Sequence, residues 1–449
     1  MKEISIHWMR RDMRIEDNRA LLAAIESGHQ ILCAFIFDES ILKRLDNSND
    51  RRVSFIHHQV LLLQQQLREL GGELMIGHGE PKAVWAKWIT HLTARELNVQ
   101  EVHVGRDYEP YAQKRDQDLA EWFSLNGIQF KGCKDSVILE KNEVTKDDGK
   151  PYTVFTPYSK KWRKTLDPKD LEKALSKENL TQVKLISASE LGNFAVPSLE
   201  EMGFDNVWDD GSWMPSSRVE DTLLAHYGEK RDFPAVRGTS RLSVHLRFGT
   251  ISIREAMRQG MKTSEKWTTE LIWRDFYQMI VYHFPHSATD SFRPAYDAIP
   301  WINDETQFGA WCQGKTGYPL VDAGIRELLA TGFMHNRVRM VVASFLCKHL
   351  LIDWRWGERF FARHLLDFDL ASNAGGWQWA AGSGCDAAPY FRVFNPTAQL
   401  QKFDKDHIYV RKWVPEYGTS RYPAPIVEHS MARVRAIETY RSVLKPAAS

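Results

Sequence analysis

Hydrophobic residues in the first 130 positions form short runs separated by stretches of helix length. The runs cover residues 4–9, 31–37, 73–76, 101–105 and 128–132, and the stretches include 17–27, 52–70 and 81–92. In the second stretch, one helical face carries Phe55, Ile56, Val60, Leu63 and Leu67. Strand and helix in this order predict a parallel α/β sheet with helices on both faces.

The pattern changes at about residue 133 and again at about residue 219. Residues 146–150 are charged and turn-rich, 160–178 are polar, and 192–215 contain scattered Gly and Pro. This composition predicts an interdomain linker over 133–218. Further on, helical periodicity covers 269–283, 321–331, 336–351 and 357–366, and no strand pattern is present. We therefore predict an α/β domain over 1–132, the linker, and an all-α domain over 219–449.

Composition limits the class of protein. The chain has 449 residues, of which 43% are hydrophobic and 26% are charged, so wholesale disorder and fibrous folds are excluded. Lys and Arg number 59 against 58 Asp and Glu, for a net charge of +1. A nucleic-acid partner therefore has to bind a local basic patch.

The sequence predicts a cytoplasmic protein with no membrane segment. No apolar run approaches the roughly 20 residues that span a bilayer, and charges at Lys2, Glu3, Arg10, Arg11 and Asp12 leave no signal-peptide core. The cysteines are dispersed, without a CxxC pair, at Cys33, Cys133, Cys312, Cys347 and Cys385. This pattern favours free thiols and argues against disulfides or a metal site.

Residues 238–243 read Gly-Thr-Ser-Arg-Leu-Ser and lead into apolar residues. Hydroxyl groups, backbone N–H groups and an arginine in such a loop can hold a phosphate at a helix start. The alternative is an ordinary Ser or Thr N-cap.

Residues 270–277 place Glu270, Trp273, Arg274 and Tyr277 on one helical face. An acid, a large ring and a guanidinium together suit a stacked, hydrogen-bonded base. The alternative is a salt-bridged surface helix.

Two later segments carry candidate chemistry. Residues 331–363 hold six Lys or Arg against two acids, a local excess that suits phosphate contacts, although a solvated cationic helix explains it as well. Residues 367–379 combine Asp367, Asp369, Asn373 and two Trp with the pair Gly375-Gly376, which permits close backbone approach or forms a bend between helices. Either acid is a candidate partner for Arg339.

These segments resemble the cryptochrome/photolyase flavoproteins, and most closely the class I cyclobutane pyrimidine dimer photolyases of microbes. The similarity covers nearly the whole chain, at 8–14, 238–243, 270–277, 314–319, 334–340 and 353–396. The resemblance implies a Rossmann-like α/β antenna domain followed by an all-α FAD-binding domain. It also implies a DNA-repair lyase in which light-excited, reduced anionic FAD passes an electron to a flipped-out dimer.

Carried over residue by residue, the resemblance implies three sets of site residues. FAD would be held by Tyr227, Thr239, Ser240, Arg241, Leu242, Ser243, Arg339, Asp367, Phe368, Asp369 and Asn373, with the Asn373 amide at flavin N5. The lesion and its DNA would be bound by Arg231, Glu270, Trp273, Arg274, Tyr277, Asn336, Arg337, Trp379 and Gln399. The catalytic set would be Glu270, Asn336 and Met340 with an electron relay of Trp377, Trp354 and Trp301.

Details of the resemblance separate the subfamilies. His335-Asn336 stands where (6-4) photolyases have a His-His pair, Met340 and Trp379 match dimer photolyases, and Asn373 matches photolyases where plant cryptochromes have Asp. The short C-terminal tail also favours a repair enzyme, which we expect to be a monomer. The alternatives are a cryptochrome-like blue-light photoreceptor without repair activity and a Trp-rich binding protein without flavin.

The resemblance leaves the second, antenna chromophore open. Residues 109–112 lack the Asn-Glu pair of folate-binding relatives, and residues 286–292 lack their Cys-Lys. A folate, a deazaflavin, a flavin or no antenna are the alternatives.

Overall fold

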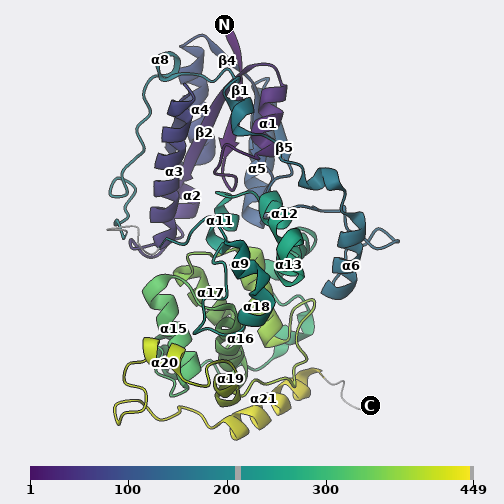
Figure 1. Ribbon diagram of the computed structural model, residues 1–449, viewed down its shortest axis with the longest axis vertical. Coiled ribbons are helices and arrows are strands. Elements are labelled where there is room, and N and C mark those ends of the chain that lie inside the picture. Colours follow the sequence, from purple (N-terminus) through teal and green to yellow (C-terminus); the bar gives the residue numbers. More distant parts are fainter. Residues whose placement is uncertain (208–213, 445–449) are drawn as a thin grey trace. The chain divides into compact units, whose positions relative to one another are not determined.

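The computed structural model describes residues 1–207 and 214–444 (Figure 1). The chain forms two compact units. The first comprises Met1–Glu140, Thr165–Arg218 and Leu242–Lys262, and the second comprises Lys141–Lys164, Val219–Arg241 and Thr263–Ser449. Part of the predicted linker thus belongs to the second unit, and part of the predicted all-α domain belongs to the first.

The first unit contains a five-stranded parallel sheet with the order β3-β2-β1-β4-β5. Its strands are β1 (Lys2–Met9), β2 (Gln30–Asp38), β3 (Leu74–Gly79), β4 (Leu97–Gly105) and β5 (Gln129–Cys133). Each predicted apolar run overlaps one strand, so the predicted parallel α/β architecture is confirmed.

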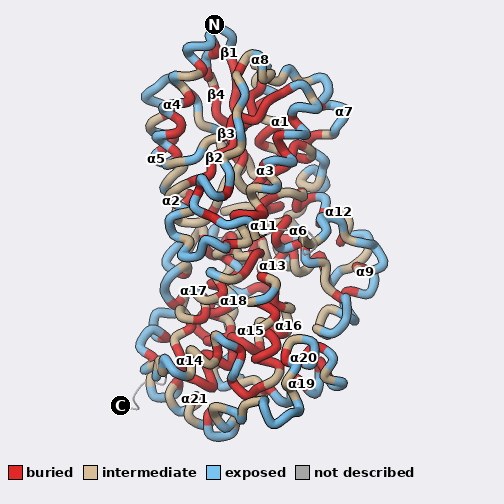
Figure 2. The backbone as a smooth tube through the Cα atoms, turned by 90° about the vertical axis from the view of Figure 1, so that its left-hand side faces the viewer, coloured by how far each residue is buried: buried red, intermediate tan, exposed pale blue. Residues whose placement is uncertain are grey.

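Helices cover both faces of this sheet. The α-helices of the first unit are α1 (Arg19–Glu26), α2 (Glu39–Leu42), α3 (Arg51–Glu69), α4 (Pro81–Thr93), α5 (Pro110–Leu125), α7 (Lys177–Leu180), α8 (Ala188–Leu191), α11 (Ser243–Phe248) and α12 (Ile253–Thr263). Figure 2 shows α4 and α5 on one side of the strands and α1 and α3 on the other. Trp85 of α4 and Phe123 of α5 bury their rings against Ile6 and Trp8 of β1.

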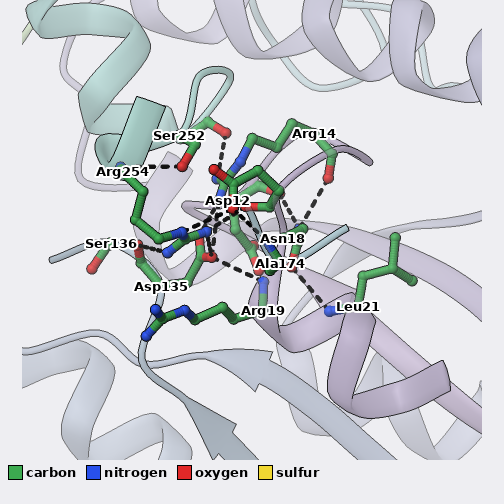
Figure 3. Close-up of polar contacts among 12 residues, drawn as sticks. Asp12, Arg14, Asn18, Arg19, Leu21, Asp135, Ser136, Ala174, Ser252 and Arg254 are labelled. Carbon is green, nitrogen blue, oxygen red and sulfur yellow. Dashed lines mark hydrogen bonds and ion pairs between the residues drawn. The ribbon is translucent and has the colours of Figure 1, made fainter. Parts of the chain in front are cut away.

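A cluster of buried charges joins α12 to the segments that follow β1 and β5 (Figure 3). Arg254 of α12 donates to Asp17 Oδ1 and to Asp135 Oδ1, each at 2.9 Å, and Arg14 donates to Asp135 Oδ2 at 2.7 Å. Burial alone would raise the pKa of Asp135, but the guanidinium groups of Arg14 and Arg254 hold it below its ordinary value. Removing one member of such a cluster leaves a buried charge uncompensated.

The second unit is helical in the part that the structure describes, apart from an isolated bridge between Thr145 and Pro151. Its helices are α6 (Phe155–Thr165), α9 (Asp221–Ala225), α10 (Tyr227–Lys230), α13 (Glu265–His283), α14 (Glu305–Cys312), α15 (Pro319–Thr331), α16 (Asn336–Ser344), α17 (Trp354–His364), α18 (Leu370–Ala381), α19 (Pro396–Phe403), α20 (Ile408–Trp413) and α21 (His429–Leu444). The predicted helix over 336–351 ends its α-helical part at Ser344 and continues as a π-helical turn, Phe345–His349.

The main hydrophobic core of the second unit is built around α15, α16 and α18. Val338 and Val342 of α16 and Trp377 of α18 are buried in it. None of the helices in the described residues is long and apolar enough to cross a membrane.

Candidate functional site

The pairing of Arg339 with Asp367 joins α16 to the turn before α18. Nη2 of Arg339 donates to Asp367 Oδ1 at 3.1 Å and to Oδ2 at 2.9 Å, and its Nε donates to the Met334 carbonyl oxygen at 2.8 Å. The Asp367 side chain is 4% exposed and that of Arg339 is 29% exposed. Of the two candidate partners of Arg339, the structure confirms Asp367, and it thereby fixes a partly exposed cation that can meet an anionic ligand.

The start of α18 is organised by carboxylates. Asp369 caps the helix by accepting from the Ser372 N–H at 3.0 Å, and Gln278 of α13 donates to both of its carboxylate oxygens. Four residues on, the Asn373 Nδ2 donates to Glu358 Oε1 at 2.8 Å. Burial raises the pKa of Glu358, while the Asn373 hydrogen bond opposes this shift. The bond orients the Asn373 amide and leaves its carbonyl oxygen to accept from a ligand.

Buried polar atoms without hydrogen-bond partners include three that belong to residues at the start of α16 and in α19. His335 accepts from the Arg337 N–H through Nδ1 at 3.2 Å, and burial lowers the pKa of His335 to about 4. The ring is therefore neutral at pH 7, with the proton on Nε2. Within the described residues, His335 Nε2, Asn336 Oδ1 and Gln399 Oε1 have no hydrogen-bond partner. One donor and two acceptors are thus available to a polar ligand.

Two ion pairs bring predicted DNA-binding residues together. Glu270 pairs with Arg231, and Arg337 Nη2 lies 2.9 Å from Asp232 Oδ1. The surface-helix alternative for residues 270–277 relied on salt bridges along that helix, but the structure gives Glu270 a partner from the segment after α10. Glu270 is 37% exposed, and such pairs are worth about 0–1 kcal/mol. A bound strand can therefore replace either partner at small cost.

Aromatic side chains of α13 and α18, Trp273, Tyr277 and Trp379, lie near one another. Trp273 and Tyr277 are stacked, with ring centroids 5.4 Å apart, and Tyr277 and Trp379 line one small cavity. A Cβ on Gly375 would lie 2.3 Å from Tyr277 Cε1, whereas a Cβ on Gly376 would meet no atom within 4 Å. Both glycines lie inside α18, so the expected bend is wrong and the expected close approach is confirmed at Gly375.

The three predicted relay tryptophans pack in or against the core of the second unit. Trp354 and Trp377 are 1% and 2% exposed, and Trp301 is half-buried. Trp377 packs edge-on against Phe361 at 4.9 Å, and Trp301 packs against Tyr440 at 5.9 Å. None of the three indole N–H groups has a hydrogen-bond partner among the described residues. Their order as an electron relay stays a prediction.

The Gly-Thr-Ser-Arg-Leu-Ser loop is not an ordinary helix cap. Helix α11 follows Leu242, which offers no side-chain cap, so the Ser/Thr N-cap alternative is wrong. Arg241 has a left-handed backbone (φ 53°), and its guanidinium lies 3.8 Å from Glu327 and 5.5 Å from the Phe333 ring. Thr239, Ser240 and Arg241 belong to the second unit, and the last two residues of the loop belong to the first.

The remaining predicted residues lie on α10, α13 and α16 or just before α18. Tyr227 is buried at the start of α10, with the Arg231 guanidinium 5.2 Å from its ring. Met340 lies one turn after Asn336 on α16, and Phe368 packs against the core between Asp367 and Asp369. Arg274 is half-buried on α13.

Some contributing residues were not predicted, among them Gln278, Glu358 and Phe155. Gln278 continues the spacing of Arg274 along α13 by one turn, a signal that helical periodicity could have supplied. Glu358 and Phe155 gave no signal, because a single acid or ring becomes informative only when the fold brings it to Asn373 or Trp273.

Comparison with known proteins agrees with this geometry. Residues 5–177 match the family model "DNA photolyase", and residues 267–420 match "FAD binding domain of DNA photolyase". The chain is 37% identical to the deoxyribodipyrimidine photo-lyase of Synechococcus sp., over 95% of this chain and 94% of the relative.

Two solved structures share the architecture. A class III photolyase from Agrobacterium tumefaciens has a TM-score of 0.84 at 33% identity, covering 99% of this chain and 98% of that one. A cryptochrome from Synechocystis sp. has a TM-score of 0.84 at 26% identity, covering 97% and 99%. The parallel α/β unit and the helical flavin unit thus define a photolyase/cryptochrome flavoprotein with an FAD-binding domain. Within that class, the chain belongs to the DNA photolyase family, whose members act on DNA.

Proposed function

We propose that this protein is a monomeric, light-driven repair enzyme that splits cyclobutane pyrimidine dimers in DNA. The observation that carries the proposal is the buried, partnerless set of His335 Nε2, Asn336 Oδ1 and Gln399 Oε1 in the described residues. A pyrimidine edge offers both N–H donors and carbonyl acceptors, so one donor and two acceptors complement it.

The residues present fit FAD. Arg241 and Arg339 would supply cations, Thr239 and Ser240 would supply hydroxyl groups, and Asn373, whose amide is held by Glu358, would supply an amide oxygen. The other predicted contacts are Tyr227, Leu242, Ser243 and Asp367–Asp369. When bound, FAD supplies the absorption of light and the electron that opens the dimer.

The protein binds the dimer outside the DNA stack. Photolyases are among the enzymes that flip a target nucleotide out of the duplex. A lesion lowers the free-energy cost of this extrusion because its pairing and stacking are already disturbed. Trp273 and Trp379 provide flat walls, each worth about 1–3 kcal/mol per stacked base. Glu270 and Asn336 bind the pyrimidine edges, which requires Glu270 to exchange its contact with Arg231.

Arginines of the basic stretch over 331–363 bind backbone phosphates, whereas Lys348 of that stretch is buried and does not contribute. Arg337 is held there by Asp232 and by the Phe403 ring, 4.6 Å from its guanidinium. Phosphate contacts of this kind position the protein on DNA without reading sequence.

The test is a repair assay on DNA that contains a defined pyrimidine dimer. Purified protein with reduced FAD should remove the dimer under blue light and leave it intact in the dark. Light-driven FAD reduction without loss of dimers would instead indicate the photoreceptor alternative. The absorption spectrum of the same protein identifies any folate, deazaflavin or flavin antenna.

A further inference from the structure

Helix α6 runs beside α13, although the sequence places it in a predicted linker (Figure 1). Near its end, Trp162 Nε1 donates to Asp275 Oδ2 at 3.1 Å and Arg163 donates to Thr269 Oγ1 at 3.1 Å. At its first residue, the Phe155 ring lies on the Trp273 indole, with centroids 3.6 Å apart and planes within 5°. The two helices are thus attached at both ends of α6.

The contacts of Arg163 and Phe155 follow one stripe of α13. Glu265, Thr269 and Trp273 are spaced by four residues, so they share a face, and α6 covers that face with Arg163 and Phe155. The side chain of Glu270 is three residues from Trp273 and is paired with Arg231 instead. Trp273 therefore has α6 on one flank and the predicted lesion-binding acid on another.

Phe155 is itself fixed in place. It is 8% exposed, it packs edge-on against Phe276 at 5.8 Å, and its backbone N–H donates to Asp386 Oδ2 at 3.0 Å. Asp386 lines the small cavity shared by Tyr277 and Trp379. The residue that holds the Phe155 backbone thus borders the same cavity as two predicted lesion contacts.

The Tyr277 ring next to Trp273 is also fixed in place. Tyr277 stacks on Trp273 at an interplanar angle of 29°, and Gly375 of α18 lies so close to Tyr277 that even a Cβ would overlap it. Rotation of the Trp273 indole would separate it from Phe155 or press it against Tyr277. The plane of the indole is set by its neighbours on both helices.

We propose that Phe155 is a positioning residue, which holds the Trp273 indole in the position from which it contacts an extruded pyrimidine dimer. This inference rests on the proposed function, because it assigns the role of Trp273 to a lesion. A preset plane removes the entropic cost of ordering the ring during binding. Loss of the Phe155 ring should therefore weaken binding of damaged DNA through Trp273 alone.

The test is a double-mutant cycle of Phe155→Leu and Trp273→Leu, with Val154→Ala as control. Val154 precedes Phe155 and is 44% exposed. Dissociation constants are measured in the dark for one duplex with and without a central dimer. We expect Phe155→Leu to weaken dimer binding about fivefold, which is the low end of the roughly 5- to 150-fold effect of losing an aromatic contact to a base. Binding of undamaged DNA, FAD content and the Val154→Ala protein should match wild type.

In the Trp273→Leu background, Phe155→Leu should cause no further loss, and Phe155→Tyr should retain wild-type dimer affinity. If Phe155→Leu does not fold, Phe155→Met replaces it in the cycle, because it keeps an apolar side chain without a flat ring. Additive losses in the cycle, or equal losses on damaged and undamaged DNA, would overturn the positioning role while leaving repair intact. An unchanged affinity for the dimer in Trp273→Leu would overturn this inference, because Trp273 would then not contact the lesion. A wild-type protein without repair activity would instead show that the proposed function itself is wrong.

Discussion

Replacing Gly357 with alanine should displace the predicted relay residue Trp377 without altering its chemistry. A Cβ at this position of α17 would lie 2.1 Å from Trp377 Cη2, 2.4 Å from Cζ3 and 2.6 Å from a Leu346 methyl carbon. Ordinary contact begins at 3.4 Å, so the indole has to move by about 1.3 Å or the helices have to separate. Overpacking of this kind costs about 1–3 kcal/mol.

Gly376→Ala is the matched control. Gly376 lies inside the neighbouring helix α18, and an added Cβ there meets nothing within 4 Å. Both substitutions gain about 1 kcal/mol of helix propensity. The difference between their free energies of unfolding therefore isolates the overpacking and should be about 1–3 kcal/mol.

Urea unfolding followed by far-UV circular dichroism measures this difference, and the rate of FAD reduction under blue light reports the position of Trp377. We expect Gly357→Ala to unfold at lower urea and to photoreduce more slowly than Gly376→Ala. Equal unfolding midpoints together with equal photoreduction rates would refute the tight packing of α17 on Trp377 and its place in the relay.

Three further predictions follow from the site and its surroundings. Trp377→Phe should abolish light-driven reduction of oxidised FAD while chemically reduced protein still repairs dimers; unchanged photoreduction, measured by absorbance, would place the relay elsewhere. Arg337→Ala should weaken the binding of damaged and undamaged DNA alike, and it should reduce the steepness of log affinity against log salt concentration by about one. A loss of affinity confined to damaged DNA would place Arg337 at the lesion. Burial lowers the pKa of Lys348 from 10.5 to about 7. Between pH 7 and pH 10.5, the unfolded chain therefore holds a proton at Lys348 that the folded chain has released, and the free energy of unfolding rises with pH. Lys348→Met should therefore remove up to about 1.4 kcal/mol per pH unit of that rise, which urea titrations at pH 7 and 9 would detect, and an unchanged slope would show that Lys348 stays charged.

Local sequence patterns were sufficient to predict the strands of the parallel sheet and several long helices. Continuous apolar runs fix a buried strand within a few residues, and 3.6-residue periodicity does the same for α13 and α15. These features depend on neighbours in the sequence. For Arg339, which is 28 residues from Asp367, the sequence could list Asp367 and Asp369 as candidate partners but could not choose between them.

Contacts between distant segments were not accessible. Nothing in residues 146–178 marked Phe155 as the neighbour of Trp273, which is over a hundred residues later. The same holds for Glu270, whose partner Arg231 comes from a separate short segment. Such contacts arise from packing, so a sequence pattern can list candidates but cannot pair them.

The chain's repeated passage between its two units has a consequence for its synthesis. Asp135 is buried with the first unit's strands, yet one of its two arginine partners, Arg254, lies 119 residues further along. At about 5–20 residues per second, a ribosome needs roughly 6–24 s to add that stretch. During this interval the α/β unit lacks a cation that its finished form requires, and any nascent chain released before residue 254 leaves the ribosome with the cluster incomplete. The first half of this gene therefore does not encode a self-sufficient first half of the protein.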